Sequence, residues 1–264
     1  MTFALFSLGV TALFFISSLT LLSYGRRLGL RYLVKEGTDG LAGLRTVEGA
    51  VFALIGLLVA FTISGGLQRY DERRQLVVQE ANAISTAYDG LALLERDAAR
   101  ELQGKLKDYA QARIELYRMP HDFSLFATAE AWSGDQQGRI LERKAEIWDA
   151  AVAACSPANS GACSVVLRAL ANVFEVARVR AGAAEKHPPQ IVYMMLFGLG
   201  LGGSLLAGFS MASAKSRSSI HMVLFAGTLA ITLYVITDME FPRLGLIRID
   251  GFDHFLADVY EQMR

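Results

Sequence analysis

Four long apolar runs constrain this chain more than any other feature of its sequence. They occupy about residues 3–24, 49–67, 191–214 and 220–237, and charged segments separate them. A helix rises about 1.5 Å per residue, so about 20 apolar residues cross a hydrocarbon core of about 30 Å. The runs therefore predict four transmembrane helices. The first run is too long for a secretory signal and no basic segment precedes it, so we expect an uncleaved span.

The composition supports a membrane protein. Hydrophobic residues make up 53% of the chain, and the 20% that are charged gather outside the apolar runs. The formal net charge is zero, whereas proteins that bind nucleic acid need clustered lysine and arginine to neutralise phosphates. We therefore expect a multi-pass protein of the cell (inner) membrane with the lipid bilayer as its surroundings, and we exclude nucleic acid as a partner.

Small residues run along the third span. They are Gly198, Gly200, Gly202, Gly203, Ser204, Ala207 and Gly208. In lipid, small residues let neighbouring helix backbones approach closely, so we expect this span to pack tightly against protein. Glycine is also common in membrane helices generally, so the pattern alone does not identify the neighbour.

Residues 68–189 form a polar segment with helical periodicity, which predicts a water-exposed helical domain between the second and third spans. The first apolar stripe, with residues three or four apart, is Ile84, Tyr88, Leu91, Leu94, Ala98, Leu102, Leu106 and Tyr109. We expect this helix to continue from the second span, because no proline lies between Phe61 and Tyr117. Gly65-Gly66 and Asp89-Gly90 are the candidate bends.

Two further helices are predicted in this domain. One begins near residues 133–135 and turns Ile140, Ile147, Trp148 and Val152 inward. The other spans about residues 164–185, with Val166, Leu170, Val173, Phe174 and Val176 as its apolar positions. We therefore predict an all-α integral membrane protein: spans in residues 1–67 and 190–238, and a short interfacial, amphipathic tail over 239–264.

The side of the membrane that the domain faces is less clear. The loop after the first span carries Arg26, Arg27, Arg31, Lys35 and Arg45, and the loop after the third carries Lys215 and Arg217. Basic loops mark the cytoplasmic side, which favours an extracytoplasmic domain. Cys155 and Cys163 flank a short polar loop and are a candidate disulfide, although two unpaired thiols are the alternative. Arginines also flank the domain itself, so the charge count is nearly even.

No pattern typical of an enzyme occurs in the sequence. The histidines are scattered, at His121, His187, His221 and His254, and none pairs with another at metal-ligand spacing. A phosphate-binding glycine loop and a Gly-x-Ser-x-Gly elbow are also missing. We expect no catalytic residue, metal or cofactor. His221, near one end of a span, is the only weak candidate for a membrane enzyme.

Two charged clusters follow spans on the same side of the membrane. Their members are Arg69, Glu72, Arg73 and Arg74 after the second span, and Asp238, Glu240 and Arg243 after the fourth. Opposite charges at one boundary can pair, because guanidinium groups bind carboxylates in a fixed fork. Anchoring at the lipid headgroups is the alternative.

The apolar second span also has two interpretations. Rings of apolar residues can gate ions by dewetting, but a helix that faces lipid has the same composition.

The stretch from Phe61 to Ala83 resembles the bestrophin family, especially its bacterial members. The matching features are Phe61 near the end of an apolar span, then, eight residues on, Arg69-Tyr70-Asp71-Glu72-Arg73-Arg74, then Gln79-Glu80-Ala81-Asn82-Ala83. The layout of two spans, a helical domain and two further spans fits as well. The chain looks like the bestrophin-like branch of this family, and its segment from Pro242 to Arg248 also fits that branch.

This resemblance implies a homopentameric channel for small anions such as chloride, lined by the second span. Its apolar neck would fall at Phe61, Leu57 and Ala53, with Thr62 as a further pore candidate, although Ala53 is small for a constriction. The resemblance also implies a cytosolic domain, which conflicts with the charge and cysteine argument and leaves the side open. The alternative function is a non-conducting sensor or scaffold whose helical domain binds a partner.

Overall fold

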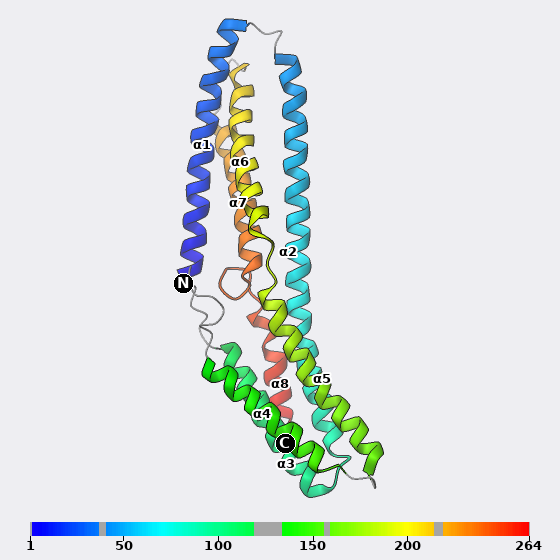
Figure 1. Ribbon diagram of the computed structural model, residues 1–264. Coiled ribbons are helices and arrows are strands. Elements are labelled where there is room, and N and C mark those ends of the chain that lie inside the picture. The colour runs from blue at the N-terminus through cyan, green and yellow to red at the C-terminus, as the bar shows by residue number, and fades with distance from the viewer. Residues whose placement is uncertain (1, 37–40, 119–133, 156–158, 214–218, 264) are drawn as a thin grey trace. The chain divides into compact units, whose positions relative to one another are not determined.

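The computed structural model describes residues 2–36, 41–118, 134–155, 159–213 and 219–263, and these residues contain helices and no strand. The membrane-spanning and connecting helices are α1 (Thr2–Glu36), α2 (Leu41–Leu91), α3 (Arg96–Arg118), α4 (Gly134–Ala153), α5 (Ser160–Glu185), α6 (Gln190–Ser210) and α7 (Ser219–Glu240). The last, α8 (His254–Gln262), follows a short 3-10 turn η4 (Asp250–Phe252), and another such turn, η3 (Met211–Ser213), extends α6. The predicted all-α class is confirmed (Figure 1).

The chain divides into two compact units. Residues 1–68 and 187–247 form the membrane unit, and residues 69–186 and 248–264 form the helical unit. Segments of α1, α2, α6 and α7 are long and apolar enough to cross a membrane, which confirms the four predicted spans. Helix α2 runs unbroken from one unit into the other, as its single ribbon shows in Figure 1.

Close backbone contact holds α1 against α6. A Cβ atom added to Gly208 would collide with the carbonyl oxygen of Leu22, and one added to Gly25 would collide with that of Leu205. The buried hydroxyls of Ser18 and Ser204 lie 3.1 Å apart at the same contact. The expected tight packing of the third span is therefore confirmed on one face.

The opposite face of α6 is open within the described chain. Cβ atoms added to Gly198 and Gly202 would meet no atom within 4 Å. Only Gly200, Gly203 and Gly208 face neighbouring helices, where a Cβ on Gly203 would come within 2.8 Å of Ile55 Cδ1 on α2. The glycines of this span therefore divide between a packed face and an exposed one.

The helical unit has its own hydrophobic core, built mainly from α2, α3, α4 and α5. Ile84, Leu91, Leu102, Leu106 and Tyr109 of the predicted stripe are all buried in it. They lie on two helices, because α2 ends at Leu91 and α3 begins at Arg96. Backbone bonds of the i to i+3 type, such as Ala92 N to Asp89 O at 3.2 Å, tighten the last turn of α2. The chain therefore turns beside Asp89-Gly90, one of the two predicted bends.

One prediction for α4 is wrong. Trp148 and Val152 are 38% and 50% exposed, whereas Ile140, Ile147 and Ala151 form the buried face. These three are spaced by seven and four residues, so Trp148 and Val152 each lie one residue, or about 100°, further round the helix. The predicted beginning of this helix lies partly outside the described residues.

The C-terminal tail forms part of the helical unit. Helix α8 packs against α3, Leu256 is buried in the common core, and the Lys107 ammonium donates a hydrogen bond to the carbonyl of Met263. Asp253, just before α8, bonds to Arg180 of α5 at 3.0 Å. The tail predicted to be interfacial thus contributes to the core of this unit.

Candidate pore helix and charged clusters

The membrane part of α2 exposes one face along its length. Phe61 is 68% exposed and Leu57 53%, and Ala53, Ala60 and Ser64 are also exposed. Residues three and four apart lie above one another on a helix, so these five make one continuous stripe, which we call the α2 stripe. It contains no charged side chain, and all five of its residues are exposed within the described chain. Such a face is available to lipid or to further copies of the chain.

Thr62 lies on the other side of α2. Its side chain is only 7% exposed and its hydroxyl donates to the carbonyl of Leu58 at 2.7 Å. Ile55, on the same side of the helix, is also 7% exposed and lies beside Gly203 of α6. Of the four pore candidates, the structure thus brings Ala53, Leu57 and Phe61 onto one face and separates Thr62 from them.

Arg73 binds the end of α5 within the helical unit. Its guanidinium is buried and donates from Nε to the carbonyl of Ala183 at 3.0 Å and from Nη2 to that of Lys186 at 2.8 Å. The last carbonyls of a helix have no intrahelical partner, so this arginine stabilises the C-terminus of α5. Glu72 pairs with the Lys186 ammonium at 2.9 Å on the exposed side of the same contact.

The neighbouring residues of this cluster bind within the same unit. Arg74 lies 3.7 Å from the Asp71 carboxylate, and its guanidinium stands 4.9 Å from the centre of the Phe252 ring. The Tyr70 hydroxyl donates to the carbonyl of Arg248 at 3.1 Å. The segment after the second span therefore ties α2 to α5 and to the C-terminal tail.

Asp238 and Glu240 organise the end of α7 in the membrane unit. The Asp238 carboxylate is fully buried and accepts hydrogen bonds from the backbone nitrogens of Leu246 and Ile247 at 2.7–3.0 Å. Gly245 is required beside it, because a Cβ there would collide with this carboxylate. Asp238 thus holds the chain that leaves the fourth span in a fixed turn.

The Glu240 carboxylate lies near a histidine in the segment just before α6. Glu240 is 1% exposed and lies 3.7 Å from Nδ1 of His187, whose ring stacks on Phe241 at 4.9 Å between centroids. Arg243 follows in the turn that Asp238 holds. Asp238 therefore binds the turn after α7, and Glu240 lies beside the segment before α6; both contacts belong to the membrane unit.

A buried ionic cluster in the helical unit was missed by the sequence analysis. Glu80 of α2 is 0% exposed, and its two carboxylate oxygens accept from Arg113 Nε at 2.6 Å and Arg180 Nη1 at 2.7 Å. Arg180 also bonds to Asp253, and its guanidinium stacks 3.5 Å from the centre of the Tyr117 ring. One feature of the sequence could have indicated that Glu80 is buried: Val77 and Ile84, which are both buried, flank it at helical spacing on the same face.

This cluster shifts the pKa of two groups. Burial by itself would raise the pKa of Glu80, but Arg113 and Arg180 outweigh it and hold that pKa below its usual 4.5. Burial raises the pKa of Tyr109 to about 12, and the nearby Glu80 charge adds to the effect while Arg113 opposes it. At neutral pH, Glu80 is therefore ionised and Tyr109 carries its proton.

Cys155 and Cys163 lie side by side where α4 ends and α5 begins. Their Cα atoms are 5.6 Å apart, with their sulfur atoms in contact. This separation falls within the range found for bridged cysteines. The geometry permits the predicted disulfide.

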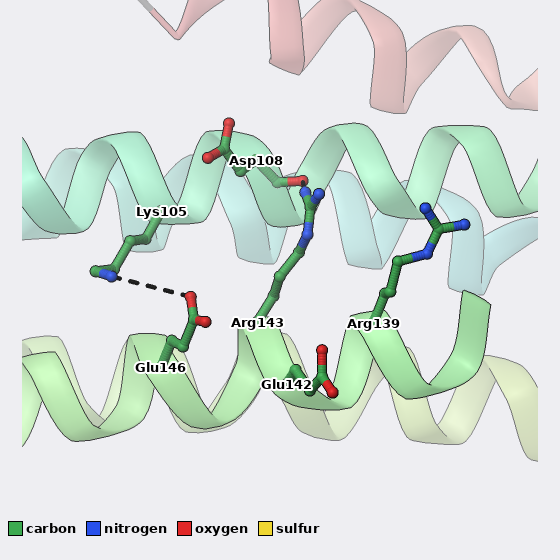
Figure 2. Close-up of a pocket in the computed structure, with 6 residues that line it drawn as sticks. All are labelled: Lys105, Asp108, Arg139, Glu142, Arg143 and Glu146. Carbon is green, nitrogen blue, oxygen red and sulfur yellow. Dashed lines mark hydrogen bonds and ion pairs between the residues drawn. The ribbon is translucent and has the colours of Figure 1, made fainter. Parts of the chain in front are cut away.

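A hollow of about 330 Å³ between α3 and α4 is lined by charges of both signs (Figure 2). Its lining residues are Lys105, Asp108, Arg139, Glu142, Arg143 and Glu146. The Lys105 ammonium lies 3.9 Å from Glu146, and Arg143 donates to the backbone carbonyl of Asp108. Because acidic and basic groups balance, the hollow offers no field that would select an ion of one sign. Within the described part of the chain, no three metal-ligating side chains converge either.

Comparison with known proteins gives a family match over most of the chain. The model of the bestrophin-like domain matches residues 4–250. A bacterial bestrophin homolog from Klebsiella pneumoniae, phased on zinc, superposes with a TM-score of 0.56 at 17% identity over 93% of this chain and 98% of that one. A point variant of a Klebsiella pneumoniae homolog gives 0.59 at 18% identity, over 94% and 97%. No curated protein matches. At these identities the superpositions show a shared fold.

Proposed function

The chain belongs to the bestrophin-like family, and from that premise we propose that it is an oligomeric membrane channel that conducts small anions along an axis lined by α2. Characterised members of the family are anion channels. The observation that carries the proposal for this chain is the α2 stripe, an uncharged, uncovered face on a helix that crosses the membrane. Chloride is the natural probe ion, and the pentamer implied by the resemblance is the proposed assembly in the cell (inner) membrane.

The chemistry of the α2 stripe suits a gated pore. Leu57 and Phe61 are one turn apart, and copies of them around an axis make two apolar rings that bar hydrated ions when the rings are narrow. Ala53, Ala60 and Ser64 are small, which lets several copies of the helix approach one another. With Ala53 small, we place the constriction at Leu57 and Phe61. A carboxylate is absent from this stretch, so nothing there repels an anion.

Cysteine modification of α2 tests this assignment. We expect a hydrophilic thiol reagent to reduce chloride flux to near background in liposomes that contain Leu57→Cys, made in a Cys155→Ser/Cys163→Ser background. Thr62→Cys is the matched control on the same helix, because its side chain faces the bundle and no flux should be lost. Equal sensitivity of the two variants, or insensitivity of both, would contradict an axis on this face.

The exposed stripe on α4 favours the second candidate function, a non-conducting sensor or scaffold. Leu141, Trp148 and Val152 are 58%, 38% and 50% exposed, and their spacing places them on one face of the helix. Aromatic and aliphatic residues of this kind are typical of contact surfaces between proteins. In that case the helical unit binds a partner, and exchanging the four spans for unrelated ones should leave binding intact. Loss of chloride flux after the same exchange distinguishes the channel.

A further inference from the structure

The part of α2 that belongs to the helical unit has an exposed face without charge. From Gln75 to Tyr88 the only charged residue is Glu80, which is buried. The exposed residues of this stretch are three or four apart and so form one line along the helix, which we call the polar line. Its members are Gln75, Gln79, Asn82 and Thr86. Their side chains end in three amides and one hydroxyl.

Other helices of the same unit expose charged groups instead. Helix α3 exposes Arg100, Glu101 and Asp108, and α4 exposes Glu142 and Asp149. Charged residues are typical of a helix face that meets bulk water. A face that meets only water has no reason to avoid them. The composition of the polar line therefore indicates a surrounding other than bulk water.

The polar line keeps the helical register of the α2 stripe. Gln75 follows Leu57, and Gln79 follows Phe61, each about five whole turns further along the helix. Helix α2 is unbroken between them. The helix face that carries apolar residues in the membrane unit is therefore the face that carries amides in the helical unit.

Acidic groups near this face are matched by bases. Asp71 and Glu72 lie between the α2 stripe and the polar line in the sequence, and they pair with Arg74 at 3.7 Å and with Lys186 at 2.9 Å. Glu80 is turned into the core, where two arginines bind its carboxylate. Within this stretch of α2, the carboxylates are thus neutralised and present no net charge that would repel an anion.

We propose that the polar line coordinates the permeating anions in the helical unit, with the amides of Gln75, Gln79 and Asn82 as the specificity-determining groups. This inference rests on the proposed channel function. Each amide offers two N–H donors, and donors from several copies around an axis replace part of the water that an anion sheds. Neutral donors bind an anion more weakly than a guanidinium does. The ion is therefore held and then released, as conduction requires.

Gln79→Glu tests whether anions pass along the polar line, because it puts a carboxylate of nearly the same shape on every copy. We expect the single-channel chloride conductance in planar bilayers to fall about fivefold, the effect of two like charges about 4 Å apart in water. Gln137→Glu is the matched control: Gln137 is exposed on α4, away from this line, and its conductance should equal that of the wild type.

The outcomes separate this inference from the channel itself. If Gln79→Glu conducts like Gln137→Glu while modification of Leu57→Cys still blocks the current, the inference is wrong and the channel stands. If the wild type does not conduct, the proposed function is wrong and the inference is lost with it.

Charge can also be added after assembly, which avoids any defect in folding. Gln79→Cys is made in the Cys155→Ser/Cys163→Ser background and modified during recording with thiol reagents of opposite charge and similar size. We expect the anionic reagent to lower the chloride current and the cationic reagent not to lower it. Equal effects of the two reagents would contradict the inference. So would a thiol that mass spectrometry finds unmodified, because the line would then be packed between copies.

Gln79→Leu tests the hydrogen bonds of the amide, since leucine is similar in size and offers no donor. Chloride holds its water more tightly than iodide, so it depends more on donors that replace that water. We expect the chloride-to-iodide permeability ratio, measured from reversal potentials, to fall about two- to tenfold, the effect of one hydrogen bond. The ratio should stay unchanged in Gln137→Leu. An unchanged ratio in Gln79→Leu as well would refute the role of the amides.

Discussion

Replacing Glu80 with alanine is expected to lower the free energy of unfolding of the helical unit by about 3–5 kcal/mol. The loss of stability comes from the two arginines that stay buried after the substitution. Arg113 and Arg180 are 5% and 6% exposed, and the Glu80 carboxylate binds both, at 2.6 and 2.7 Å. Without Glu80, Arg113 loses its carboxylate partner but stays buried, and Arg180 loses the more deeply buried of its two and keeps only the Asp253 carboxylate at 3.0 Å. Equilibrium denaturation of the full-length protein in detergent, followed by circular dichroism, measures the change.

Glu72→Ala provides the matched control. Glu72 lies on the same helix and also forms an ion pair, with Lys186 at 2.9 Å, but the two side chains are 41% and 59% exposed. Exposed pairs contribute about 0–1 kcal/mol, so this variant should stay close to the wild type. Similar losses in the two variants would mean that the buried cluster contributes no more than a surface pair.

The same cluster sets the response of the helical unit to acid. The folded-state pKa of Glu80 lies below the ordinary 4.5, so its contribution to stability is fully present above about pH 4.5. The contribution is lost as the pH falls through the lower folded-state pKa. The difference in unfolding free energy between the wild type and Glu80→Ala should therefore be largest at neutral pH and shrink at strongly acidic pH. A difference that grows with acid would contradict the sign.

Gly208→Val is expected to disrupt the membrane unit. Even a single Cβ at this position would collide with the carbonyl oxygen of Leu22, and a backbone atom cannot rotate away as a side chain can. Overpacking of a well-packed core costs about 1–3 kcal/mol or more, and here α1 and α6 have to separate. We expect the variant to elute as aggregate or degraded protein in detergent size-exclusion chromatography, and the wild type to elute as one symmetric peak.

Gly202→Val on the same helix is the control for that substitution. It adds the same side chain, but a Cβ at Gly202 would meet nothing within 4 Å in the described chain. Folding of the single chain should therefore survive. If both variants elute like the wild type, α1 and α6 are not in the close contact seen here. If Gly202→Val folds but forms smaller complexes, the open face of α6 contacts another copy.

The sequence predicted those features that depend on residues close together in the chain. The four spans follow from uninterrupted apolar runs, and the continuation of α2 follows from the absence of proline after Phe61. The core stripe of α2 and α3 was also found, because periodicity depends only on neighbours three and four apart. The turn after Leu91 was predicted as one of two bends, and glycine content could not choose between them.

Features that depend on distant partners could not be predicted in this way. Glu80 meets Arg113 and Arg180, which lie on two other helices, and nothing in the local pattern of either arginine distinguishes it from a surface one. The prediction that Trp148 is buried was wrong for a similar reason. The sequence does not show whether an apolar residue next to a buried stripe is itself buried or exposed. Thr62 was a further pore candidate, but it points about 100° away from its neighbour Phe61 on the helix.

A current recording from purified full-length protein in planar bilayers shows whether the protein is an anion channel lined by α2. With a chloride gradient across the bilayer, we expect a current that reverses near the chloride equilibrium potential and disappears when Leu57→Cys is modified by a hydrophilic thiol reagent. Bilayers that conduct no better than protein-free ones, or a current that reverses near the equilibrium potential of the cation, would contradict it.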